Sequence, residues 1–187
     1  MPFYYDQKDR SSFMISWYQN PRDAFDVFSR GYRKAAENLV SQLLEAPRFS
    51  DYEAYPVIFL YRHALETSLK HIIYKSADLA AISLVEEHDH GFLNSHNLLE
   101  LARTVDRVLG RLYPEDAFLG RVLSVLSTTC LEFAQIDRSS YCYRYPIDKK
   151  GAQSTKKDQE VTLRTFATHL SQLLEDLDTL SFGLNAE

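Results

Sequence analysis

The chain has 187 residues, of which 45% are hydrophobic and 25% charged, and its formal net charge is −5 at pH 7. The length suffices for one domain with a substantial core, and the acidic balance argues against broad binding to duplex nucleic acid, which needs an extended basic face. Cys130 and Cys142 have no metal-ligand spacing and do not suggest a disulfide scaffold. We expect no cofactor.

The N-terminal residues lack the basic and then apolar pattern of a signal sequence, and no apolar run approaches the roughly 20 residues of a membrane helix. These features, together with the small number of cysteines, predict a cytoplasmic protein that does not interact with a membrane. Residues 1–19 contain several aromatic side chains and predict an arm that packs either on the remaining domain, residues 20–187, or on a neighbouring molecule.

Five stretches repeat their apolar residues with the helical period, and no stretch of comparable length alternates like a strand. Asn20 and Pro21 suit the start of the first, the pair Asn94-Ser95 suits the start of the third, and Pro114 opens the fourth. In chain order the expected helices cover about 20–47, 56–74, 94–112, 114–136 and 163–180. Their apolar stripes predict an all-α, five-helix up-and-down bundle.

The segment from Arg138 to Lys157 is a basic interruption before the last helix. Its six basic residues face one acid, Asp148, within a chain of net charge −5. It is either an anion-binding element or a solvated surface loop, and the turn residues from Asp148 to Gly151 predict a short loop or hairpin. The candidate phosphate- or RNA-binding residues are Arg138, Arg144, Lys149 and Lys150.

Arg144 has a structural alternative, an ion pair with Asp137 or Asp148 that pins the segment to the bundle. The second expected helix also carries a line of charge, with Arg62, Glu66 and Lys70 four residues apart. This line is either an exposed charged face or a polar seam that faces the basic segment or a partner subunit. The residues expected to support such a seam are Arg62, His63, Glu66 and Asp137.

The remaining histidines give two further hypotheses. His88, His90 and His96 lie near acidic residues but lack the second ligand pair of a zinc site, so no metal site is expected, and His96 fits a polar first turn. Arg164 and His169 could act in metal-free RNA cleavage, with the histidine moving a proton and the arginine stabilising the phosphate. Five residues of helix separate them by about 140°, so such a site would need a two-fold interface. The alternative is a boundary histidine and a surface arginine.

Three runs, Phe59–His71, Ser95–Leu101 and Phe133–Gly151, resemble bacterial HEPN-like proteins. The resemblance implies a helical bundle, often dimeric, in a superfamily rich in RNases of toxin–antitoxin, phage-defence and CRISPR systems. Some members are non-catalytic and bind nucleotides or RNA. The family's catalytic signature is an arginine followed after four to six residues by a histidine, with a polar residue directly after the arginine. Arg164, Thr165 and His169 match it.

The sequence therefore leads us to expect a homodimeric, HEPN-like module of a bacterial defence or stress system of toxin–antitoxin type. It would interact with RNA or with nucleotide phosphates, and it could be a metal-independent RNase with Arg164 and His169 as catalytic residues. An antitoxin or another defence-system protein would be its partner. The alternatives are a non-catalytic module whose basic segment docks an acidic protein, and a structural bundle with an unknown small ligand.

Overall fold

The computed structural model describes residues 13–14, 24–79, 94–137, 140, 142–148, 150–154 and 160–184. These residues form five α-helices and no strand: α1 (Ala24–Glu45), α2 (Asp51–Leu79), α4 (Leu98–Leu112), α5 (Ala117–Ile136) and α6 (Leu163–Gly183). The prediction of an all-α, five-helix bundle is confirmed. The expected N-terminal arm lies outside the described residues, apart from Phe13 and Met14.

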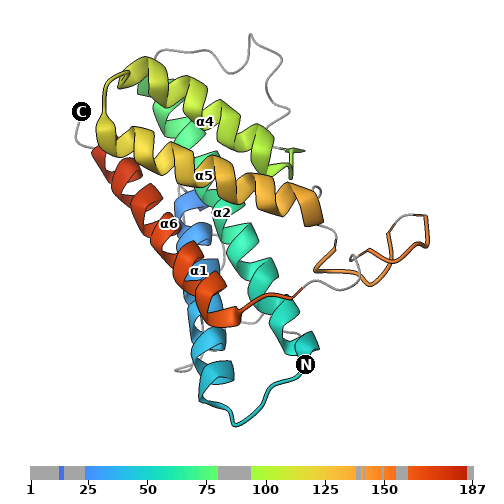
Figure 1. Ribbon diagram of the computed structural model, residues 1–187. Coiled ribbons are helices and arrows are strands. Elements are labelled where there is room, and N and C mark those ends of the chain that lie inside the picture. The colour runs from blue at the N-terminus through green and yellow to red at the C-terminus, as the bar shows by residue number, and fades with distance from the viewer. Residues whose placement is uncertain are drawn as a thin grey trace.

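The long helix α2 is the centre of the bundle and packs against α1, α4 and α6 (Figure 1). α1 and α2 form an antiparallel pair. α4 begins beside the middle of α2 and runs in the same general direction, whereas α5 returns antiparallel to α4. α6 packs on α1, α2 and α5. The segment before α6 extends away from the bundle at the end of α5 (Figure 1).

The core is built from the apolar stripes that the sequence predicted. Every expected stripe residue of α2 is buried, as are most of those on the other helices. The two expected stripe residues that are exposed, Phe28 (44%) and Ala35, both lie on α1. Ser29, the neighbour of Phe28, is buried and donates a hydrogen bond to the carbonyl oxygen of Ala64 at 2.9 Å. The small side chain of Ser29 thus packs directly against the backbone of α2, and Phe28 is directed outward.

α2 begins five residues before the predicted start at Pro56. The reason is the sequence Ser50-Asp51-Tyr52-Glu53, in which the Glu53 carboxylate accepts a hydrogen bond from the Ser50 backbone N–H at 2.6 Å. This is one half of a capping box, a signal that starts helices. Pro56 lies early in the helix and has no backbone N–H, so it cannot make the helical hydrogen bond to the carbonyl oxygen of Tyr52. The side chain of Tyr52 is exposed.

Two other helix starts also differ from the prediction. α4 is capped by Asn97, whose side-chain oxygen accepts from the Leu99 N–H at 3.2 Å, rather than by the pair Asn94-Ser95. α5 is capped by Asp116, which accepts from the Leu119 N–H at 2.7 Å, rather than starting at Pro114. In both cases the helix begins after a residue whose side-chain oxygen satisfies a backbone N–H of the first turn.

Among the described residues, α5 is the one helix long and apolar enough, by length and composition, to cross a membrane. The expectation that no apolar run approaches that length is therefore corrected. The core helix of a soluble protein meets the same criterion, and α5 buries Leu119, Val122, Leu126 and Phe133 against the other helices. α5 thus contributes to the core of the bundle.

Candidate functional site

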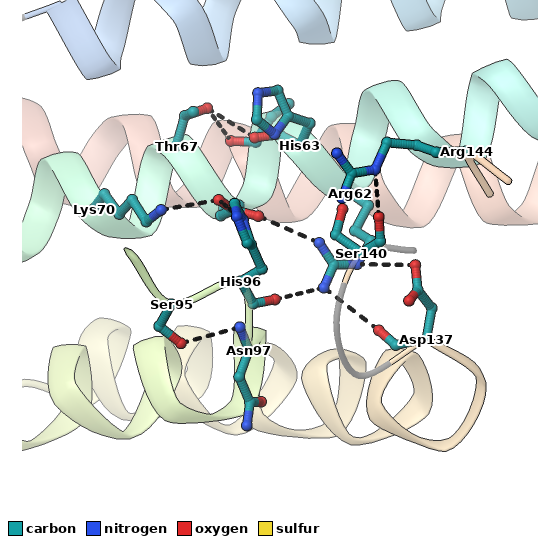
Figure 2. A network of polar contacts seen from close by, with 12 residues as sticks. Arg62, His63, Thr67, Lys70, Ser95, His96, Asn97, Asp137, Ser140 and Arg144 are labelled. Carbon is teal, nitrogen blue, oxygen red and sulfur yellow. Dashed lines mark hydrogen bonds and ion pairs between the residues drawn. The ribbon is translucent and has the colours of Figure 1, made fainter. Parts of the chain in front are cut away.

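A charged network is buried where the middle of α2 meets the start of α4 and the end of α5. Arg62, Glu66 and Lys70 are each at most 4% exposed, so the exposed charged face considered for them is wrong. Lys70 Nζ lies 2.9 Å from Glu66 Oε1, and Arg62 Nη1 lies 3.3 Å from Glu66 Oε2. Neighbouring elements cover this face of α2, so these three residues form a seam inside the protein (Figure 2).

Asp137 joins this network from the far end of α5. It is the residue at which that helix ends, and it is 1% exposed. Its Oδ2 lies 3.7 Å from Arg62 Nε, and its carbonyl oxygen accepts from Arg62 Nη2 at 3.4 Å. Burial lowers the pKa of Arg62, against the charges of Asp137 and Glu66, which raise it. The structure thus brings together three of the four residues of the expected seam: Arg62, Glu66 and Asp137.

His96 is the exposed end of the network. Its Nδ1 lies 2.9 Å from Glu66 Oε1, and its carbonyl oxygen accepts from Arg62 Nη2 at 2.6 Å. Half of the His96 side chain is exposed. Burial would raise the pKa of Glu66, but its interactions with Lys70 and His96 outweigh burial and hold that pKa below its ordinary value. The ionised carboxylate can only accept, so His96 Nδ1 donates and Nε2 is the basic nitrogen of the neutral ring.

This arrangement resembles the carboxylate–imidazole pair of general acid–base sites. A buried carboxylate fixes one ring nitrogen, and the other nitrogen is left to exchange a proton with a ligand. Lys70 and Arg62 hold the Glu66 carboxylate in place from two sides. The sequence reasoning assigned His96 only to a polar first turn, because its partner Glu66 lies 30 residues earlier on another helix.

His63, the fourth residue of the expected seam, lies apart from this network. Its ring packs edge-on against Tyr32 of α1, with centroids 4.5 Å apart, and stacks on Phe59 at 5.6 Å. Burial lowers the pKa of His63, an effect that the Glu66 charge opposes and the charges of Lys70, Arg62 and His96 reinforce. His63 therefore belongs to the contact between α1 and α2.

The basic segment contains a short hairpin, as the sequence predicted. Ile147 and Gln153 pair as a single antiparallel bridge, and the Asp148 carboxylate accepts from the backbone N–H groups of Lys150 and Ala152 at 2.8 and 2.9 Å. Gly151 has a φ of +80°, a conformation that glycine adopts without strain. Lys150 is exposed at this turn, while Arg138 and Lys149 lie outside the described residues.

Arg144 holds the base of the hairpin rather than forming an ion pair among the described residues. Its Nε donates to the carbonyl oxygen of Ser140 at 2.5 Å, and its guanidinium lies 5.9 Å from the ring centroids of both Phe59 and Tyr145. The Asp148 carboxylate is used by the turn, and Asp137 faces Arg62. The ion-pair alternative for Arg144 is thus wrong, although the residue does link the segment to α2 through Phe59.

The structure places Arg164 and His169 on different sides of α6. His169 lines a cavity of about 580 Å³ between α5, α6 and the basic segment, together with Thr129, Tyr143, Phe133 and Phe166. Arg164 is exposed and is not part of that lining. Within one chain the two candidate catalytic residues are not brought together.

The hydrogen bond of His169 defines which of its nitrogens faces a ligand. Thr129 Oγ1 lies 2.7 Å from His169 Nε2 and 2.9 Å from the carbonyl oxygen of Val125. The hydroxyl has one hydrogen, which it donates to that carbonyl, so it accepts from His169 Nε2–H. The neutral ring then keeps Nδ1 as its acceptor. Among the described residues, no hydrogen bond or ion pair joins His169 to a carboxylate as His96 is joined to Glu66.

The described residues contain no group of three or more histidine, cysteine or acidic side chains arranged to hold a metal ion. His88 and His90, considered as ligands in the sequence, lie outside those residues. Searches with this chain find no match among protein-family models, among curated proteins or among solved structures. The HEPN-like resemblance thus stays a prediction.

Proposed function

We propose that this protein is a cytoplasmic, HEPN-like module of a bacterial defence or stress system that interacts with RNA or with nucleotide phosphates. The observation that carries the proposal is the pair of Glu66 and His96 beside the basic segment. An imidazole oriented by a carboxylate and a nearby set of cations are the two components that phosphate chemistry without a metal requires.

The charges of the network support an anionic ligand. Within the buried part, the cations Arg62 and Lys70 are balanced by the carboxylates of Glu66 and Asp137. Arg144 forms no ion pair among the described residues, so it adds a positive charge next to this balanced network, and its charge is one of those that act on Arg62. A phosphate at this edge would meet Arg144 and His96 without having to displace a buried carboxylate.

With RNA as substrate, the chemistry balances without a metal. His96 Nε2 accepts the proton of a ribose 2′-hydroxyl, the 2′-oxygen attacks the phosphorus, and the 5′-oxygen leaves with a proton from water. The hydroxide that remains takes the proton from the His96 ring, which returns to its neutral form. The products are a 2′,3′-cyclic phosphate and a free 5′-hydroxyl. The cation of Arg144 would stabilise the charge on the phosphate in the transition state.

The pair of Arg164 and His169 remains the second assignment of the proton-transfer residues. Because the two lie apart in one chain, they could act together only across a two-fold interface, so this assignment requires the homodimer that the sequence led us to expect. A direct comparison of variants at His96 and His169 therefore decides which histidine transfers the proton.

The test is RNA cleavage in the presence of a chelator by the wild type, His96→Ala and His169→Ala. We expect the wild type to yield fragments with 2′,3′-cyclic phosphate ends and His96→Ala to lose at least about 100-fold in rate. A loss in His169→Ala alone would assign the reaction to the Arg164 and His169 pair. Wild-type protein that neither cleaves nor binds RNA or nucleotides would refute the proposal.

A non-catalytic docking module is the second candidate. The observation in its favour is the group of exposed apolar side chains around the basic segment, Tyr145, Ile147 and Val161, which are 47–54% exposed. Apolar contacts beside basic charges suit an acidic protein partner, such as an antitoxin. A complex with an acidic protein encoded by a neighbouring gene, together with no binding of RNA or nucleotides, would favour this candidate.

A further inference from the structure

We infer that the exposed N-terminal part of α2, with Tyr145 of the hairpin, is a stacking surface for the bases of single-stranded RNA. This inference rests on the proposed function and specifies its substrate class. The surface consists of Tyr52, Tyr55, Phe59 and Tyr145. In the part of the chain that the structure describes, Tyr52, Tyr55 and Tyr145 are 70%, 42% and 49% exposed.

The aromatic residues and the charged network occupy one continuous face of α2. Tyr52, Tyr55 and Phe59 are spaced by three and four residues, and the same spacing continues through Arg62, Glu66 and Lys70. At 100° per residue all six lie within about 80° of the helix circumference. The C-terminal half of this face is covered by the start of α4 and the end of α5, and its N-terminal half is open.

The hairpin lies beside the open, N-terminal half of this face of α2. Tyr143 lies against Tyr55 with ring centroids 6.3 Å apart. The Arg144 guanidinium lies at 5.9 Å from the ring centroids of both Phe59 and Tyr145. The Arg144 cation thus lies between aromatic rings on this surface. Rings for bases and cations for phosphates are the combination with which proteins bind single strands without sequence preference.

The carboxylates nearby keep their negative charge, although two of them accept backbone hydrogen bonds. Glu53 accepts from the Ser50 N–H at the helix start, and Asp148 accepts from two backbone N–H groups of the turn. Against these charges and that of Asp51 in the first turn of α2, the segment from Arg138 to Lys157 carries six basic residues and only one acid. The basic excess of this segment favours an anionic ligand. The exposed parts of the Tyr52, Tyr55 and Tyr145 rings offer flat surfaces for bases rather than enclosed pockets for peptide side chains.

The dimensions along α2 also suit a strand. The rise of 1.5 Å per residue puts the Cα atoms of Tyr52 and Tyr55 about 4.5 Å apart along the axis, and those of Tyr55 and Phe59 about 6 Å apart. These spacings exceed the roughly 3.4 Å between stacked bases, so successive bases can separate and stack on the rings. A strand that follows this face would lead toward Arg144 and the network that ends in His96.

The test measures binding of a fluorescently labelled single-stranded RNA by anisotropy, for the double variant Tyr52→Ala with Tyr55→Ala. We expect affinity to fall at least tenfold, and the double variant Tyr52→Phe with Tyr55→Phe to bind like the wild type, because stacking needs the ring and not the hydroxyl. Phe182→Ala is the matched control. Phe182 is 75% exposed near the C-terminal end of α6, which lies far from the start of α2 (Figure 1), and its loss should leave binding unchanged.

The outcomes separate this inference from the proposed function. If Lys149→Ala with Lys150→Ala weakens RNA binding and the tyrosine-to-alanine variant binds like the wild type, the stacking surface is refuted while the phosphate function stands. If the tyrosine variant changes the mass measured by light scattering and leaves RNA binding unchanged, the surface is a protein interface and the inference is overturned. If the wild type binds no RNA, the inference falls together with an RNA function, whereas binding of free nucleotides would leave the phosphate function intact.

Discussion

Arg62 Nε lies 3.7 Å from Asp137 Oδ2, so the middle of α2 is bound to the residue that ends α5. The two residues are 75 positions apart, and both are 1% exposed. Arg62 also donates to the carbonyl of His96, which directly precedes the cap of α4. One guanidinium therefore links three helices at the point from which the basic segment departs.

Arg62→Ala should strongly destabilise the fold. The substitution leaves the carboxylates of Glu66 and Asp137 buried without this cation, and breaking a buried ion pair typically costs about 3–5 kcal/mol of unfolding free energy. Chemical denaturation measures the loss. Arg30→Ala is the control, because Arg30 forms an exposed pair with Asp26 that is worth at most about 1 kcal/mol. Equal effects of the two substitutions would contradict the account of the network.

His63→Phe should flatten the dependence of stability on pH between about 7 and 5. Burial depresses the pKa of His63 in the folded state, so below the ordinary pKa of about 6.5 the unfolded chain binds more protons. The wild type should therefore lose stability as pH falls through that window. Phenylalanine keeps a ring between Tyr32 and Phe59 and does not titrate. Melting temperatures measured across the range test this, and parallel profiles for the two proteins would contradict it.

Arg144→Ala should affect stability and binding together, whereas loss of Lys149 and Lys150 should affect binding alone. Arg144 donates to the Ser140 carbonyl and contacts the Phe59 ring, so its loss should cost on the order of 1 kcal/mol as well as RNA affinity. Melting curves and titrations at several salt concentrations separate these effects. Each phosphate contact removed should reduce the salt slope by about 0.7 to 0.9. Stability loss without any change in affinity would make Arg144 a purely structural residue.

Both cysteines should react slowly with alkylating reagents at neutral pH in the folded protein. Burial raises the pKa of Cys130 to about 12, and burial together with the charge of Asp137 raises that of Cys142 to about 11. The Cys142 thiol also lies 2.9 Å from the carbonyl oxygen of Ser154, to which it donates. Mass spectrometry after timed alkylation should show little modification until denaturant is added. Rapid labelling of Cys142 would indicate that the hairpin opens.

The helices were predictable because their apolar residues recur with one period, and that period is a local property. The start of α2 was also encoded, in Ser50 and Glu53, but Pro56 suggested a later beginning. The burial of Arg62 and Glu66 could not be predicted from the local sequence. Charges spaced by four residues fit an exposed face equally well, and only the packing of α4 and α5 decides between the two. The partnership of Glu66 with His96 depends on the same packing.

The separation of Arg62, His96 and Asp137 along the chain has a consequence for the order of folding. A charge that has left water before its partners arrive is costly, so the guanidinium should remain hydrated until α2, α4 and α5 have all come together. The network would then form after the rate-limiting barrier. Substitutions of Arg62 should accordingly speed unfolding far more than they slow refolding, so this cluster would determine how long the native state persists rather than how quickly it is reached.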